Sequence, residues 1–169
     1  MLQKIVLSLL TCTTLLLAFS ENELPMLEMK DTKLAFKDIA GYSNYKIVAT
    51  HFRKDQNELR YILANPIAYK ALKNKEIVMP DGSKIVKIGW KVKEMTAFPA
   101  AFEADKIQRV EYMIKDKTKH KESDGWGYAR FIKKGDEYKA WDGDVNECVS
   151  CHAIMNSNDF LFTKFQPIF

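Results

Sequence analysis

Cysteine and histidine, the residues that most often build metal clusters and disulfide frameworks, are scarce in this sequence. The 169 residues include three of each. Two of the histidines, His51 and His120, lie far from any cysteine, so a second Cys/His cluster that would complete a zinc site is lacking. Cys12 lies in a predicted signal peptide, which leaves only Cys148 and Cys151 in the mature chain. A separate disulfide framework is therefore excluded.

Internal repeats, low-complexity stretches and an interdomain linker are also lacking. A chain of this length without such boundaries predicts a single domain, large enough to bury a hydrophobic core. The formal net charge is only +4, and the lysines are spread along the chain rather than gathered into a basic stripe. The composition therefore implies no nucleic-acid partner.

The first 20 residues have the pattern of a secretory signal peptide. Lys4 precedes an apolar run over residues 5–19, and Ala18 and Ser20 place small residues at positions −3 and −1 of a cleavage site. An uncleaved membrane anchor is the alternative, but a run of about 15 residues is short of the roughly 20 that a span needs. We expect cleavage near Ser20, export to the periplasm, and one domain over residues 21–169.

The two remaining cysteines belong to a C-x-x-C-H motif, Cys148-Val149-Ser150-Cys151-His152. Two thiols three residues apart lie on one side of a helical turn, where both can reach the vinyl groups along one porphyrin edge. The histidine that follows can then bind the iron. The motif predicts one covalently attached haem c with His152 as axial ligand. Bacterial haem c is attached outside the cytoplasm, which agrees with export.

Three other interpretations of this motif are a structural disulfide, a thioredoxin-like redox pair and one half of a zinc site. The zinc site lacks its second cluster. A redox pair needs a strand before it and a helix that opens at the first cysteine, whereas residues 142–144 (Asp-Gly-Asp) predict a turn. Haem attachment is the interpretation that the sequence favours.

Runs of β-branched and aromatic residues predict five or six strands that follow one another as hairpins. One helix is predicted over residues 67–75, after a proline suited to a first helical turn, and residues 94–105 are predicted as a loop or short helix. The fold class expected is α+β, a mostly antiparallel sheet with a few helices and the haem on a C-terminal helical turn. The expected strands cover residues 45–53, 59–64, 84–93, 107–115, 125–133 and 138–141.

The predicted strand at residues 84–93 has two different faces. One face is apolar and is expected in the core, together with alternate residues of the strand at 107–115. The opposite face includes Lys87 and Gly89, and its pattern alone predicts a solvated lysine face. A glycine inside a strand often marks the close approach of another group. The expected core residues are Val86, Ile88, Trp90, Val110, Tyr112 and Ile114.

Several short motifs occur in a fixed order along the mature chain. They are Tyr45-Lys46-Ile47-Val48 with His51-Phe52-Arg53, Leu59-Arg60 through Asn65, Pro80-Asp81-Gly82, Lys87 with Trp90, Gly125-Trp126-Gly127-Tyr128, the C-x-x-C-H motif, and Asp159-Phe160-x-Phe162-Thr163. In this order and spacing, from about Gly41 to Phe162, the chain resembles the cytochrome P460 family and the related beta-type cytochromes c-prime. The resemblance implies an antiparallel β protein, a homodimer, and a pentacoordinate haem with histidine on one side.

The resemblance also suggests a role for Lys87. In cytochromes P460 a lysine on the strand after the P-D-G turn is bonded to a meso carbon of the porphyrin, and Lys87 stands at that place. Lys84, Lys91 and Lys93 are close enough that a shift of register would move the assignment. The family also implies a distal carboxylate that assists proton removal. Asp159 is the acidic candidate within a family motif, with capping of the turn after the haem segment as the alternative.

The activity that the resemblance implies is oxidation of hydroxylamine, with nitric oxide as a further substrate, and transfer of electrons to a soluble acceptor. A second hypothesis is a non-enzymatic haem protein that binds nitric oxide in an apolar pocket. A third is an electron-transfer cytochrome, for which Met155 lies too close to His152 to reach the other haem face, while Met79, Met95 and Met113 stay open. The aromatic residues expected in the apolar pocket are Phe98, Phe102, Phe131, Phe160 and Phe162.

Overall fold

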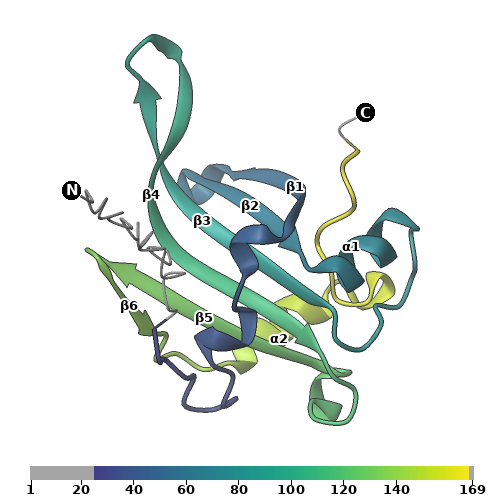
Figure 1. Cartoon of the computed structure of the whole chain (residues 1–169). Helices are drawn as coiled ribbons and strands as arrows, with labels where there is room; N and C mark the ends of the chain where they lie inside the picture. The colour runs from purple at the N-terminus through teal and green to yellow at the C-terminus, as the bar shows by residue number, and fades with distance from the viewer. Residues whose placement is uncertain (1–24, 168–169) are drawn as a thin grey trace, which may run out of the picture.

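The computed structural model of the chain describes residues 25–167, and in it six strands form one antiparallel sheet (Figure 1). The strand order is β1-β2-β3-β4-β5-β6, so each strand pairs with its neighbour in sequence. The predicted signal peptide lies outside the described residues. The strands are β1 (Lys46–Arg53), β2 (Glu58–Ala64), β3 (Lys84–Met95), β4 (Phe98–Lys115), β5 (Trp126–Lys134) and β6 (Glu137–Ala140).

Two α-helices and several short 3-10 turns complete the described fold. The predicted helix is confirmed as α1 (Pro66–Lys73), where the Asn65 side chain accepts a hydrogen bond from the Ala68 amide and caps the first turn. The second helix is α2 (Asn146–Ala153), and neither helix is long and apolar enough to cross a membrane. The 3-10 turns are η1 (Phe36–Ile39), η2 (Tyr42–Asn44), η3 (Lys54–Gln56), η4 (Lys121–Ser123) and η5 (Asn156–Asn158).

The expected α+β class is confirmed, but the prediction for residues 94–105 is wrong. These residues belong to the ends of β3 and β4, which pair with each other as far as Met95 and Phe98. The hairpin that they form projects beyond the rest of the sheet (Figure 1). The two strands pair their facing backbone groups, and the side chains on both faces of the hairpin are exposed or half-buried. Without a buried face there is no period-two pattern to reveal it in the sequence.

The sheet has a hydrophobic core on each face. On one face, Val86, Val110 and Phe131 pack against the N-terminal segment, where Phe36 and Ile39 are fully buried. Of the six residues predicted for this core, Val86, Ile88, Val110 and Tyr112 are buried, while Trp90 and Ile114 are partly buried against it.

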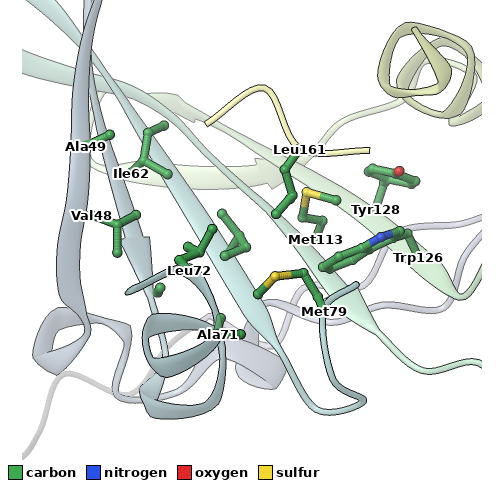
Figure 2. Close-up of a cluster of buried hydrophobic side chains, with 13 residues drawn as sticks. Val48, Ala49, Ile62, Ala71, Leu72, Met79, Met113, Trp126, Tyr128 and Leu161 are labelled. Atoms are coloured by element: carbon green, nitrogen blue, oxygen red, sulfur yellow. The ribbon is translucent and has the colours of Figure 1, made fainter. Parts of the chain in front are cut away.

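The second core lies on the opposite face, under α1 and the C-terminal segment (Figure 2). Its members include Ile62 from β2, Ile85 from β3, Met113 from β4, Trp126 from β5 and Leu161 from the C-terminal segment. The expectation of a solvated lysine face on β3 is therefore wrong, because Ile85 is buried there and the strand is covered on both sides. Beside this core, the same face of the sheet borders a cavity.

Candidate functional site

Helix α2 brings the three residues of the C-x-x-C-H motif to the edge of one cavity. Before the helix, the Asp144 side chain accepts a hydrogen bond from the Asn146 amide. Cys148 and Cys151 are free thiols, one half-buried and one exposed. Both line a cavity of about 550 Å³ together with His152. This volume lies within the range of small-molecule and cofactor sites.

The cavity has an apolar part and a charged part. The charged residues come mainly from the sheet, and the basic ones outnumber the two carboxylates, Glu111 and Glu147, among the described lining residues. A planar apolar group with negatively charged substituents would match this division. The apolar lining includes Ile62, Leu72, Ile85, Met113, Leu161 and Phe162, and the basic lining includes His51, Arg53, Arg60, Lys87 and Arg130.

The imidazole of His152 is held in one orientation. Its Nδ1 atom lies 2.7 Å from the carbonyl oxygen of Phe160, so Nδ1–H donates and Nε2 keeps its lone pair free. The Tyr128 ring lies against the imidazole at a centroid distance of 4.9 Å, and the Phe162 ring lies edge-on at 5.2 Å. Burial lowers the pKa of His152, which favours the neutral imidazole. A neutral, oriented imidazole is the form that binds iron.

Lys87 lies on the cavity face of β3 in contact with Glu111. Its Nζ atom is 2.6 Å from Glu111 Oε2, and Glu111 Oε1 accepts a hydrogen bond from Arg130 Nε at 2.6 Å. Burial lowers the pKa of Lys87, although the charge of Glu111 opposes this shift. Burial alone would raise the pKa of Glu111, but Lys87 and Arg130 outweigh it, and the pKa falls to about 2.

Lys87 is the only one of the four lysines on β3 that lines the cavity, within residues 25–167. The Lys84 ammonium donates a hydrogen bond to the Asp38 carbonyl in the N-terminal segment. Lys93 forms an ion pair with Glu103 in the projecting hairpin. Lys91 is exposed. Among the alternative registers left open by the sequence, the tertiary structure therefore favours Lys87 as the lysine beside a bound group.

Gly89 marks the close approach of another group, as expected for a glycine inside a strand. Glu58 is fully buried, and its carboxylate pairs with Arg60 at 2.5 Å and with Arg109 at 2.7 Å. A Cβ atom on Gly89 would lie 2.7 Å from Glu58 Oε2. The missing side chain therefore makes room for this carboxylate.

Asp159 is not among the residues that line the cavity. Its Oδ1 atom lies 2.7 Å from Lys115 Nζ, and its Oδ2 accepts a hydrogen bond from the Met79 amide at 2.7 Å. It follows directly after η5 in a left-handed backbone conformation. These contacts match the alternative in which Asp159 holds the turn after the haem segment. Its role as a catalytic carboxylate stays a prediction.

Other lining residues were missed or misplaced by the sequence analysis. Glu111 and Arg130 gave no signal as single residues, although strand alternation placed Glu111 on the face opposite Val110 and Tyr112. Of the five phenylalanines expected in the pocket, only Phe162 lines the cavity. Phe131 lies in the core of the other face, Phe160 packs against the second core, and Phe98 and Phe102 are exposed on the hairpin.

Comparison with protein families gives one match that covers most of the chain. The model of a family described as cytochrome P460 matches residues 39–163. The matched range contains Lys87, Glu111 and Asp159, together with the whole C-x-x-C-H motif. A search of curated proteins finds no match.

Proposed function

Because the chain belongs to the cytochrome P460 family and is thus a c-type haem protein, we propose that it is an exported monohaem cytochrome that oxidises hydroxylamine. Nitric oxide is proposed as a further substrate. The proposal assigns the two thioether bonds to Cys148 and Cys151, and the axial bond to His152. The haem iron, when bound, supplies the redox chemistry by accepting electrons from the nitrogen of the substrate.

The observation that supports this proposal most directly is the arrangement around His152. The Phe160 carbonyl oxygen accepts a hydrogen bond from His152 Nδ1–H at 2.7 Å, which leaves Nε2 as the free ligand atom. Both cysteines of α2 line the same cavity as this imidazole. The donor set, one nitrogen and two thiols on a single helix, fits a haem c.

The charged lining suits a substrate that must lose protons as well as electrons. Hydroxylamine is small and polar, and its oxidation to nitrogen oxides releases protons. Glu111 and Glu147 are the carboxylates on the described lining. Glu111 is ion-paired with Lys87 and Arg130, so we assign to it the task of holding Lys87 in place. We propose Lys87 as the residue that contacts, and bonds to, the porphyrin.

The apolar part of the lining favours a second candidate, a protein that binds nitric oxide without turnover. Ile62, Leu72 and Ile85 form an apolar surface beside the charged residues. Such a surface suits a diatomic gas better than a polar amine. For an electron-transfer cytochrome, the third reading, Met113 is the methionine on the described lining, whereas Met79 is buried in the core and Met155 follows α2 directly.

Stopped-flow mixing of the ferric holoprotein with hydroxylamine and an artificial electron acceptor separates these candidates. Multiple turnovers, with nitrogen-oxide products, are expected for the enzyme. Tight binding of nitric oxide without turnover of hydroxylamine would favour the gas-binding protein. A low-spin ferrous spectrum without added ligand would contradict both and favour electron transfer. Lys91→Ala, an exposed neighbour on β3, is a control expected to keep the wild-type rate.

Export, the electron acceptor and the oligomer are parts of the same proposal. We propose cleavage after Ser20, function in the periplasm, electron delivery to a soluble acceptor, and a homodimer. Export is supported by the haem chemistry, since bacterial haem c is attached outside the cytoplasm. The intact mass of the mature protein tests the cleavage site, which places Glu21 at the new N-terminus.

A further inference from the structure

We infer that the buried ion pair of Lys115 and Asp159, here called the latch, is a positioning device that holds the Phe160 carbonyl on His152. The latch thereby sets the strength of the bond from His152 to iron. This inference rests on the proposed role of His152 as axial ligand. It assigns to Asp159 a task outside the cavity, in the second layer of residues behind the haem ligand.

The latch is an unusually enclosed ion pair. The Lys115 side chain is 2% exposed and that of Asp159 is 9% exposed. Lys115 Nζ lies 2.7 Å from Asp159 Oδ1, donates to the Asp124 carbonyl at 3.0 Å, and lies 4.8 Å from the centre of the Trp126 ring. Charged side chains are rarely buried so fully unless each is paired. Lys115 is the last residue of β4, and its ammonium lies beside Trp126, the first residue of β5. Asp159 is held at this place by its ion pair with Lys115.

The carboxylate of Asp159 also ties together two distant segments. Its second oxygen, Oδ2, accepts a hydrogen bond from the Met79 amide at 2.7 Å, and Met79 is itself fully buried. Asp159 is thus fixed from two sides, by β4 through Lys115 and by the segment before β3 through Met79. A residue held at both carboxylate oxygens has little freedom to rotate.

The backbone at the latch is in a conformation that needs such support. Asp159 has φ +45° and the next residue, Phe160, has φ +66°. Two successive non-glycine residues in the left-handed region are costly, and such geometry persists only where the surroundings impose it. The conformation turns the chain so that the Phe160 carbonyl meets His152 Nδ1 at 2.7 Å.

The latch acts on His152, the proposed iron ligand, through the Phe160 carbonyl. A hydrogen bond from Nδ1–H to a fixed acceptor makes the imidazole a stronger donor at Nε2. A stronger donor stabilises ferric over ferrous iron and shortens the bond to iron. The Lys115–Asp159 contact therefore acts on the haem without touching it, and losing it relaxes the carbonyl away from Nδ1.

The test uses holoprotein made with the cytochrome c maturation machinery, in the variants Asp159→Asn, Asp159→Ala and Lys115→Met. Resonance Raman of the ferrous form measures the iron–histidine stretching band, and redox titration measures the reduction potential. All three variants are expected to shift the band to lower frequency and to raise the potential, with Asp159→Ala shifting most. Asp159→Asn keeps an oxygen for the Met79 amide, so it carries the test if Asp159→Ala fails to retain haem.

Two controls separate positioning from general loss of stability. Val110→Ala weakens the core on the other face of the sheet, and Glu103→Gln removes a carboxylate from an exposed pair in the hairpin. Both are expected to leave the band and the potential at wild-type values. Wild-type values in the latch variants, or an equal shift in Val110→Ala, would overturn the inference.

The proposed ligation is tested separately in the same experiment. The wild-type ferrous protein is expected to show an iron–histidine band that disappears in His152→Gly. If the wild type has no such band, the assignment of His152 as iron ligand fails, and the role of the latch fails with it. If the band is present but does not respond to the latch variants, only the latch is wrong.

Discussion

Lys87 and Glu111 are directly opposed across β3 and β4, and their charged groups meet at 2.6 Å on the cavity side of the sheet. Glu111 also forms an ion pair with Arg130 of β5. One carboxylate therefore binds both a lysine and an arginine beside the proposed haem site. Burial opposes the charge on Lys87 and Glu111 supports it. The lysine is consequently fixed in position while its pKa is lowered.

Lys87→Ala is expected to change the absorption spectrum of the holoprotein. A bond from the lysine to a porphyrin carbon would perturb the porphyrin and move its absorption to the red, and the variant should return to an ordinary c-type spectrum. The measurement is the absorption spectrum, with the intact mass of each holoprotein. Lys84→Ala and Lys91→Ala are matched controls, because neither residue lines the cavity.

The wild type could already have the spectrum of a high-spin cytochrome c, with no change in Lys87→Ala. That result would contradict the bond from Lys87 to the porphyrin and favour the gas-binding protein. A change in Lys84→Ala or Lys91→Ala with none in Lys87→Ala would mean that the chemistry is right and the assigned residue wrong.

Glu111→Gln is expected to lower the free energy of unfolding at neutral pH and to lose that effect in acid. The pKa of Glu111 is about 2 in the folded protein against an ordinary 4.5, so its ionised form is stabilised by folding. That contribution is present above pH 4.5 and disappears as the pH falls towards 2. The shift corresponds to at most about 3 kcal/mol.

Urea unfolding of haem-free wild-type and Glu111→Gln protein, in which Lys87 keeps its free ammonium group, measures this difference between neutral pH and pH 3. The difference in the free energy of unfolding between the two proteins should become smaller as the pH falls below 4.5. Glu103→Gln removes a carboxylate with 41% exposure, and its free energy of unfolding should differ little from that of the wild type at every pH. A gap for Glu111→Gln that does not depend on pH would contradict the ion-pair assignment.

In a Lys87→Ala background, which removes the proposed bond from Lys87 to the porphyrin, replacing both Cys148 and Cys151 by serine is expected to convert covalent haem into extractable haem. Thioether bonds survive acid–acetone treatment, whereas haem held only by His152 and by packing does not. The measurement is the haem found in the organic phase after extraction. Lys87→Ala with both cysteines intact serves as control and should retain its haem, and free haem from the wild type would refute attachment.

The projecting hairpin of β3 and β4 carries two exposed aromatic side chains that self-association would bury. Phe98 and Phe102 are each 60% exposed near its tip, and a two-stranded ribbon alone gains little stability from its own packing. If the proposed homodimer forms there, Phe98→Ser with Phe102→Ser weakens it at least tenfold. Sedimentation equilibrium measures this, with Ile77→Ser, an exposed apolar residue away from the hairpin, as control. Equal dimerisation of both variants would show that the hairpin is not the dimer interface.

The parts of the site that the sequence analysis anticipated are those encoded by local spacing. Residues 148–152 lie within α2, as expected for a helical turn that carries two cysteines three residues apart. The strands at β1, β2 and β5 were anticipated for a similar reason, since β-branched and aromatic residues favour pleated backbone whatever their partners. Alternation placed Lys87 on the face opposite Val86 and Ile88, but by itself it predicted that this face is solvated.

The parts that it missed depend on which strands lie side by side. Glu111 is 24 residues from Lys87 in the chain and becomes its partner only through the β3–β4 register. The phenylalanines were assigned to a pocket by their number, but only Phe162 reaches it, because the sheet has two faces and a free hairpin.

The sequence by itself determined the haem attachment motif, the strand-rich architecture and the family, since each depends on residues that are near neighbours or on patterns with a period of two. Only the tertiary structure decided which lysine of β3 faces the cavity, which carboxylates line it, and why Asp159 is buried. The physical reason is that charge pairing acts over a few ångströms of space. Lys87 with Glu111, and Lys115 with Asp159, meet only after the sheet and the C-terminal segment have folded together.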